Sequence, residues 1–190
     1  LKKRIPTSKN KILTLVREPI SRNISGFFED PSFRRVVQND NLSMLTDTFI
    51  SSFNHDLPLN WFDVELNGNL GIDVYSKPFD VVSGYSIIEN ENTECMVIRS
   101  DKLNDLFSVV SNFLELGDLP RKDYNITGDR SNGNVYHKLK SEIKIPTEYV
   151  NKMYESKLVT HFFSDDEITK LKNKWTNEKN TESNPSNMAG

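Results

Sequence analysis

The sequence predicts an α/β protein built on a parallel central sheet with helix-rich insertions. Two apolar runs, Lys11–Arg17 and Glu94–Arg99, have the length and composition of buried strands. Each run leads directly into an amphipathic helical pattern, and this strand-to-helix unit is the building block of a parallel α/β sheet. Several further segments show helical periodicity, so helices are expected to outnumber strands.

The first strand-to-helix unit lies near the start of the chain. After the strand Lys11–Arg17, a helix is predicted from Pro19, because proline fits the first turn of a helix, where its missing N–H is not needed. The pair Asp30-Pro31 is expected to end this helix. Its apolar stripe consists of Ile20, Ile24, Phe27 and Phe28.

Helices and a hairpin are predicted between and after the two strands. Helical patterns cover Leu42–Phe53 and, more briefly, Leu59–Leu66. The segment Ile72–Glu89 alternates apolar residues with turn residues, which favours a hairpin or a pair of short strands. After the second strand, Asp101 is a suitable N-cap for a helix whose apolar face begins at Leu103.

The last part of the chain is predicted to be helical. Two helical patterns, Val135–Ile143 and Pro146–Tyr154, are divided by Pro146. Ser164, followed three residues later by Glu167, forms a capping box that opens a helix running through Trp175.

The composition limits the domain organisation and the class of function. A chain of 190 residues suits one domain, placed at residues 1–175, and residues 176–190 are expected to be a disordered tail because they have almost no apolar residues. The net charge of −3 gives no global attraction to nucleic acid. No apolar run approaches the ~18 residues that cross a bilayer. The single cysteine, Cys95, is expected to be buried in a strand, and no metal site is predicted because no Cys/His cluster has zinc spacing.

An anion site is predicted where the first strand meets its helix. Arg17 stands at the carboxyl end of the strand, where ligands of open α/β sheets bind, and its guanidinium can pair with two phosphate oxygens. The helix from Pro19 should direct free N–H groups at the same place. Arg22 and Ser25 share a face of that helix. The alternative is a surface arginine that merely ends a strand.

The segment Leu15–Phe28, with Arg17-Glu18-Pro19 and a serine eight residues after the arginine, resembles the 3′-phosphate-binding motif of sulfotransferases. These enzymes use 3′-phosphoadenosine 5′-phosphosulfate (PAPS) as sulfuryl donor. The resemblance implies that Arg17 and Ser25 hold the 3′-phosphate of PAPS, with Arg22 beside them. It also implies that a late basic segment, here Lys138 and Lys140, clamps the cofactor from the far side; Arg130 is a further possibility.

From about Lys11 to Trp175 the chain is similar to the capsular polysaccharide synthesis family of sulfotransferase-like proteins. The similarity implies a three-layer fold of the P-loop NTPase type and transfer of a sulfuryl group from PAPS to a carbohydrate hydroxyl in the bacterial cytoplasm. The segments that carry it are Trp61-Phe62-Asp63, Pro78–Ile88, Val97–Asn104 and Met153–Ile168. The P-loop of such a fold is not found in this sequence. The first strand and its loop are expected upstream of Leu1, and the alternative is that the protein never had them.

Several residues are candidates for contact with the acceptor. His55 is the best candidate general base, because an imidazole can take a proton near neutral pH, and the alternative is a loop histidine that helps to cap the next helix. Asp63 or Glu65 could do the same work, although such residues are more often solvated helix charges. Trp61 and Phe62 could form a stacking wall for a sugar, or could simply belong to the core. Packing or surface roles are expected for His137 and His161.

Two other functions remain open at this point. A phosphotransferase of the same broad fold would need a magnesium-binding aspartate and a complete P-loop, neither of which is visible in the sequence. A non-catalytic glycan-assembly protein would retain the fold without the cofactor loop, since fold alone does not determine function.

Overall fold

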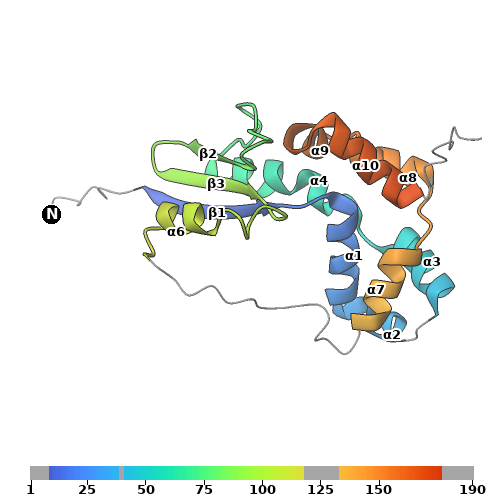
Figure 1. Ribbon diagram of the computed structural model, residues 1–190. Coiled ribbons are helices and arrows are strands. Elements are labelled where there is room, and N and C mark those ends of the chain that lie inside the picture. Colours follow the sequence, from blue (N-terminus) through green and yellow to red (C-terminus); the bar gives the residue numbers. More distant parts are fainter. Residues whose placement is uncertain (1–8, 39–40, 118–132, 177–190) are drawn as a thin grey trace, which may run out of the picture.

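A three-stranded sheet with the strand order β1-β3-β2 lies at one end of the molecule (Figure 1). The computed structural model describes residues 9–38, 41–117 and 133–176. Strand β1 (Asn10–Val16) runs parallel to β3 (Thr93–Arg99), as the two predicted strand-to-helix units require. Strand β2 (Tyr85–Glu89) is antiparallel to β3, so the sheet is mixed and the prediction of a wholly parallel sheet is wrong at this edge.

Only the last five residues of the predicted hairpin Ile72–Glu89 form a strand, β2. This strand is indeed part of a hairpin, but its partner is β3, reached through a tight turn in which Asn90 N donates to Thr93 O at 2.9 Å. Gly84, immediately before β2, has a φ of +76°. A side chain is rarely tolerated at this φ, so glycine fits the entry to the strand.

The alternation of side chains along the strands gives the sheet two buried faces. Ile12, Cys95 and Val97 face the main core, whereas Met96 and Ile98 pack with helix α6 (Phe107–Phe113). Cys95 is fully buried, as predicted. Figure 1 shows α6 on one side of the sheet and most other helices on the opposite side or beyond the carboxyl ends of the strands.

The predicted helices are present, with ends shifted by a few residues. No helix among the described residues is long and apolar enough to cross a membrane. The elements before the sheet hairpin are α1 (Pro19–Glu29), a 3-10 turn (Pro31–Phe33), α2 (Arg34–Val37), α3 (Leu42–Ser52), α4 (Leu57–Trp61), a π-helical turn η2 (Phe62–Asn67) and α5 (Gly68–Leu70). Those after α6 are α7 (Gly133–Glu142), α8 (Thr147–Tyr154), α9 (Lys157–Phe162) and α10 (Asp165–Thr176). The predicted disordered tail falls almost entirely on residues 177–190, outside the described residues.

Helix α6 departs from its prediction at its N-terminal end. It begins at Phe107 rather than near Leu103, and its N-cap is Leu106, whose side chain makes no capping hydrogen bond. Asp101 was expected to cap this helix, but its carboxylate instead accepts two hydrogen bonds from Arg99. A charge-assisted pair with a buried guanidinium is stronger than a cap bond to a backbone N–H.

Helix α1 anchors the main core. Its residues Ile20, Ile24 and Phe27 are each 0% exposed. Phe27 makes an edge-to-face contact with Phe49 of α3, with the ring centroids 5.5 Å apart. Burial of large side chains in this arrangement contributes about 2 kcal/mol each. Because α1 begins two residues after Arg17, this packing also fixes the position of the predicted anion site.

Candidate anion site at the strand ends

Arg17 and Ser25 meet at the carboxyl end of β1. The Arg17 guanidinium donates from Nη1 to Ser25 Oγ over 3.1 Å, so the two residues of the predicted clamp are in contact. Within the described parts of the chain, no carboxylate forms an ion pair with Arg17. Its charge is therefore available to an anionic ligand.

Tyr136 of α7 completes this cluster, and no pattern in the sequence identifies it as a site residue. Its hydroxyl lies 3.1 Å from Ser25 Oγ, and Lys140 Nζ lies 5.7 Å from its ring centroid. Burial alone would raise the pKa of Tyr136, but the hydrogen bond with Ser25 and the charges of Lys140 and Arg17 lower it overall. The positive charges of Lys140 and Arg17 near this hydroxyl favour an anion.

The N-terminus of α1 does not contribute as predicted. The Glu18 carboxylate accepts hydrogen bonds from the N–H groups of Ile20 (3.0 Å) and Ser21 (2.9 Å). It also accepts one from the hydroxyl of Tyr154, at 2.6 Å. An acidic side chain is favourable at the positive end of a helix. The Glu18 carboxylate therefore binds the backbone amides at which a ligand phosphate was predicted.

Arg17 lines two cavities. The first, named here the α10 cavity, measures about 330 Å³ and is lined by Arg17 together with Lys170 and Lys174 of α10. The second, named the α4 cavity, measures about 250 Å³ and is lined by Arg17, Arg22, Trp61 and Phe62, among others. Arg17 is thus a wall that both cavities share.

Four predicted site residues come together in the α4 cavity: Arg17, Arg22, Trp61 and Phe62. Phe62 is only 3% exposed and packs against Phe162, so it belongs largely to the core. Trp61 is 36% exposed and can offer an apolar face to a ligand. Burial lowers the pKa of Arg22, an effect that the nearby charge of Glu29 opposes.

The predicted residues Asp63 and Lys138 line neither cavity. Asp63 forms an ion pair with Lys157 at 3.0 Å. Lys138 is exposed on α7, and its carbonyl accepts a hydrogen bond from Ser141. Three of the weaker candidates, Glu65, His137 and His161, also lie outside both cavities, and Arg130 lies outside the described residues.

His55 belongs to a hydrogen-bonded network behind the cavities. Its Nε2 lies 2.8 Å from the carbonyl oxygen of Phe49, and its Nδ1 lies 2.7 Å from the hydroxyl of Tyr149. Asn23 of α1 donates to the His55 carbonyl oxygen at 3.0 Å. Burial lowers the pKa of His55, which keeps the ring neutral. With both nitrogens engaged, the ring fastens the 53–56 loop to α3 and α8, and the backbone carbonyl of His55 fastens it to α1.

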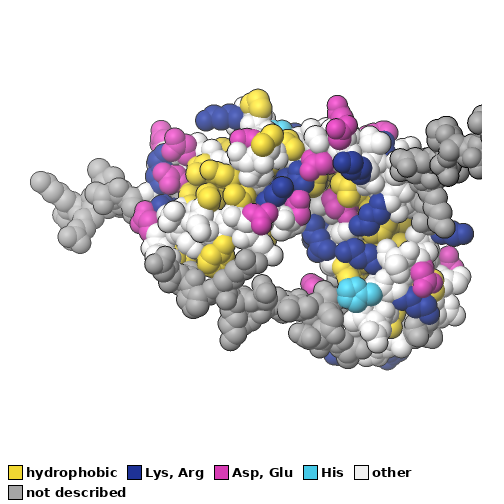
Figure 2. All heavy atoms as spheres, viewed as in Figure 1, with side chains coloured by type: hydrophobic (Ala, Val, Ile, Leu, Met, Phe, Trp, Pro, Cys, Tyr) yellow, Lys and Arg dark blue, Asp and Glu magenta, His cyan; other side chains and the backbone are white. Residues whose placement is uncertain are grey.

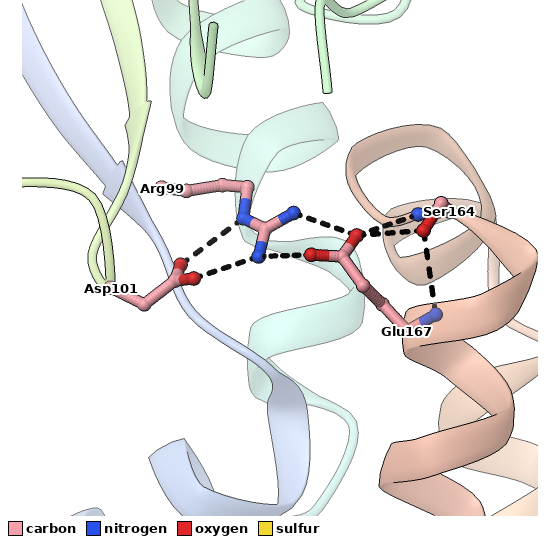
Figure 3. Close-up of polar contacts among 4 residues, drawn as sticks. All are labelled: Arg99, Asp101, Ser164 and Glu167. Carbon is pink, nitrogen blue, oxygen red and sulfur yellow. Dashed lines mark hydrogen bonds and ion pairs between the residues drawn. The ribbon is translucent and has the colours of Figure 1, made fainter. Parts of the chain in front are cut away.

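An ion cluster around the buried side chain of Arg99 forms part of the lining of the α10 cavity. Figure 3 shows the contacts within this cluster. The Arg99 side chain is 4% exposed and binds both oxygens of Asp101 and both oxygens of Glu167, at 2.7–3.1 Å. Glu167 Oε2 also accepts from Ser164 N at 2.9 Å, which confirms the predicted capping box. The Arg99 guanidinium lies 4.5 Å from the ring centroid of Phe163. The cluster therefore ties the end of β3 to the start of α10.

The Glu167 carboxylate should make stability depend on acidic pH. The hydrogen bond from Arg99 is the largest effect that lowers the pKa of Glu167, to about 2 from its ordinary 4.5. A carboxylate whose pKa is lower in the folded state stabilises the fold at pH values above its unfolded-state pKa. For Glu167 this contribution to the free energy of unfolding is roughly 2 kcal/mol after allowance for solvent screening. It is lost as the pH falls from about 5 to 2. Urea unfolding across this range should show a shallower loss for Glu167→Gln than for the wild type. If the free energy of unfolding depended on pH identically in both proteins, the Glu167 carboxylate would not be the source of this stabilisation.

The two lysines of the α10 cavity were not identified from the sequence. Lys170 and Lys174 are four residues apart and share a face of α10. That spacing is visible in the sequence, but it is also usual for a solvated helix face. Only the fold, in which α10 packs against α8 and α9 and its Glu167 binds Arg99 at the end of β3, shows that these lysines line one cavity with Arg17.

Comparison with known proteins gives a family match over much of the chain. The sequence profile described as "Putative capsular polysaccharide synthesis protein" matches residues 34–164. Two curated proteins named Maintenance of telomere capping protein 6, from Candida albicans strains WO-1 and SC5314, are each 26% identical over 162 residues. The match covers 85% of this chain but 23% of theirs, so the chain spans about a quarter of the length of these relatives. No solved structure matches.

Proposed function

The chain belongs to the capsular polysaccharide synthesis family, and from this premise we propose that it transfers a sulfuryl group from PAPS to a carbohydrate hydroxyl. The observation that carries the proposal is the contact between Arg17 and Ser25 at the end of a parallel strand. A guanidinium without a carboxylate partner and a hydroxyl, side by side, suit a phosphate group. The segment with these residues precedes the part of the chain that the family profile matches.

The residues present fit the 3′-phosphate of PAPS in part. Arg17, Ser25 and Tyr136 supply donors to one small region. The amides of Ile20 and Ser21 do not take part, because Glu18 already binds them. When bound, PAPS would supply the sulfuryl group and a stable leaving group. The three side chains would hold and orient the nucleotide at its 3′-phosphate.

The α4 cavity supports a carbohydrate as acceptor. Trp61 presents a partly exposed aromatic ring beside Arg17 and Arg22, and such a ring can stack on the apolar face of a sugar. The arginines can donate hydrogen bonds to hydroxyl or carboxylate oxygens of the same sugar. A role for His55 or Asp63 as general base stays a prediction, since each would first have to leave its present partner.

Calorimetric titration tests the nucleotide site. We expect 3′-phosphoadenosine 5′-phosphate (PAP) to bind more tightly than 5′-AMP, because only PAP carries the 3′-phosphate. Arg17→Ala should lower the affinity for PAP by roughly 10- to 100-fold and remove the preference for PAP over 5′-AMP, because a charge-assisted hydrogen bond is lost. Arg35→Ala, an exposed arginine of α2, is the matched control and should leave both affinities unchanged. Equal affinities for the two nucleotides, or no effect of Arg17→Ala, would contradict the proposal.

A non-catalytic glycan-assembly role is the second candidate, and one observation favours it. Among the described residues, each carboxylate that lines the α10 cavity already has a strong partner: Glu18 binds α1, and Asp101 and Glu167 bind Arg99. No histidine lines either cavity. Binding of PAP without transfer of labelled sulfate from PAPS to a capsular polysaccharide would favour this second candidate.

A further inference from the structure

The α10 cavity presents one face of α10 to the strand ends. Lys170, Leu171 and Lys174 line it, and the two lysines are one helical turn apart. Lys172 lies between them in sequence but points elsewhere, because its Nζ binds Glu155 at 2.9 Å. The helix therefore offers the cavity two cations and one apolar side chain.

The charged side chains that line this cavity are four cations and three carboxylates, so its net charge is positive: Arg17, Arg99, Lys170 and Lys174 against Glu18, Asp101 and Glu167. Glu18 is satisfied by two backbone amides and Tyr154, and the remaining carboxylates, Asp101 and Glu167, are held by Arg99. In the described parts of the chain, no carboxylate forms an ion pair with Lys170 or Lys174, nor with Arg17 across the cavity. Figure 2 shows dark-blue Lys and Arg side chains gathered where α10 and α7 approach α1. Arg17, Lys170 and Lys174 thus face one cavity.

The uncharged lining suits an organic ester of phosphate or sulfate. Ser21 and Ser100 place hydroxyl-bearing side chains in the wall, and these can donate to anionic oxygens. Phe163 and Leu171 supply apolar surface beside them. A volume of about 330 Å³ exceeds what a single inorganic phosphate fills and leaves room for part of the attached organic group.

We propose that the α10 cavity is a second anion subsite, in which Lys170, Lys174 and Arg17 bind a phosphate or sulfate group of a nucleoside bisphosphate. This inference rests on the proposed function for the identity of the ligand. Arg17 contacts Ser25 and also lines the α10 cavity, so one guanidinium can serve two anion positions. A ligand with two separated anionic groups matches this arrangement. The group at Ser25 is then the 3′-phosphate, and the 5′ group lies against α10.

Titrations with three adenosine phosphates separate the two subsites. The double variant Lys170→Ala/Lys174→Ala should lower the affinity for PAP and for 5′-AMP by about tenfold or more, because two cations are lost. Its affinity for 3′-AMP should stay within about twofold of the wild-type value. Ser25→Ala should weaken PAP and 3′-AMP but spare 5′-AMP. Lys172→Ala is the matched control, since it removes a lysine of the same helix that lines neither cavity. Unfolding temperatures of all variants show that the fold is intact.

The outcomes distinguish this subsite from the proposed function. If PAP binds with the expected dependence on Arg17 but the double variant behaves like Lys172→Ala, the α10 subsite is overturned and the proposed function stands. If no adenosine phosphate binds, inorganic pyrophosphate is titrated as the probe. If pyrophosphate binds and its binding needs Lys170 and Lys174, the anion subsite is supported although the proposed function fails. If pyrophosphate does not bind, or binds equally well to the double variant, the subsite is overturned.

Discussion

Replacing Trp175 with alanine is expected to lower the free energy of unfolding by about 4 kcal/mol. The Trp175 side chain is 2% exposed, and its Nε1 donates to the hydroxyl of Tyr154 at 2.8 Å. That hydroxyl in turn donates to Glu18 at the start of α1. The substitution therefore leaves a cavity and also removes a donor from a buried chain of hydrogen bonds. Urea unfolding monitored by circular dichroism measures the change.

Trp61→Ala is the matched control for this measurement. Trp61 is 36% exposed, so its loss should cost much less than the loss of Trp175. Trp175→Phe should fall between the two, because it retains most of the ring volume but not the N–H donor. If Trp175→Ala were no more destabilising than Trp61→Ala, α10 would not be an integral part of the core.

Arg99→Ala is expected to destabilise the fold by about 3 kcal/mol, the typical cost of removing one partner from a buried ion cluster. The substitution leaves Asp101 and Glu167 facing each other across the end of β3 without the cation that holds both. Their side chains are 55% and 33% exposed, so water can solvate them in part, which moderates the loss. Thermal unfolding should show a decrease of roughly 10 °C for a domain of this size.

Two further variants separate charge from geometry at this cluster. Arg99→Lys retains the charge but not the planar fork that binds two carboxylates, so it should recover only part of the stability. Lys172→Ala breaks an exposed pair with Glu155 and should cost less than about 1 kcal/mol. Equal stabilities of Arg99→Ala and Lys172→Ala would show that the cluster does not hold α10 against the sheet.

The secondary structure was predictable wherever local patterns decide it. The capping box of Ser164 and Glu167 appears as predicted because both partners lie within one helical turn. The cap at Asp101 was a similar local prediction and was wrong, because Arg99 competes for the carboxylate and is itself held in place by Glu167, 68 residues away. Likewise, the pattern of Ile72–Glu89 predicted a hairpin or a pair of short strands, but it did not reveal that β3 is the strand beside β2.

The candidate site was predictable only for residues that are close together in the sequence. Arg17 and Ser25 meet because a strand end and the first turns of its helix are necessarily close. Tyr136 comes from α7 and Lys174 from α10, and no spacing in the sequence shows that the first contacts Ser25 or that the second lines a cavity with Arg17. His55 was predicted as a general base from its position in a loop. In the fold, Phe49 and Tyr149 engage both nitrogens of its ring, and the sequence does not show these tertiary contacts.

The carboxylate of Glu18 at the start of α1 has a consequence for the kinetics and selectivity of ligand capture. Because the first amides of α1 are already satisfied, this junction is preorganised, and no backbone has to become ordered when a ligand arrives. The same negative charge repels an incoming anion from the helix axis. In the proposed site, an anion is therefore expected to bind the guanidinium of Arg17 rather than the end of the helix.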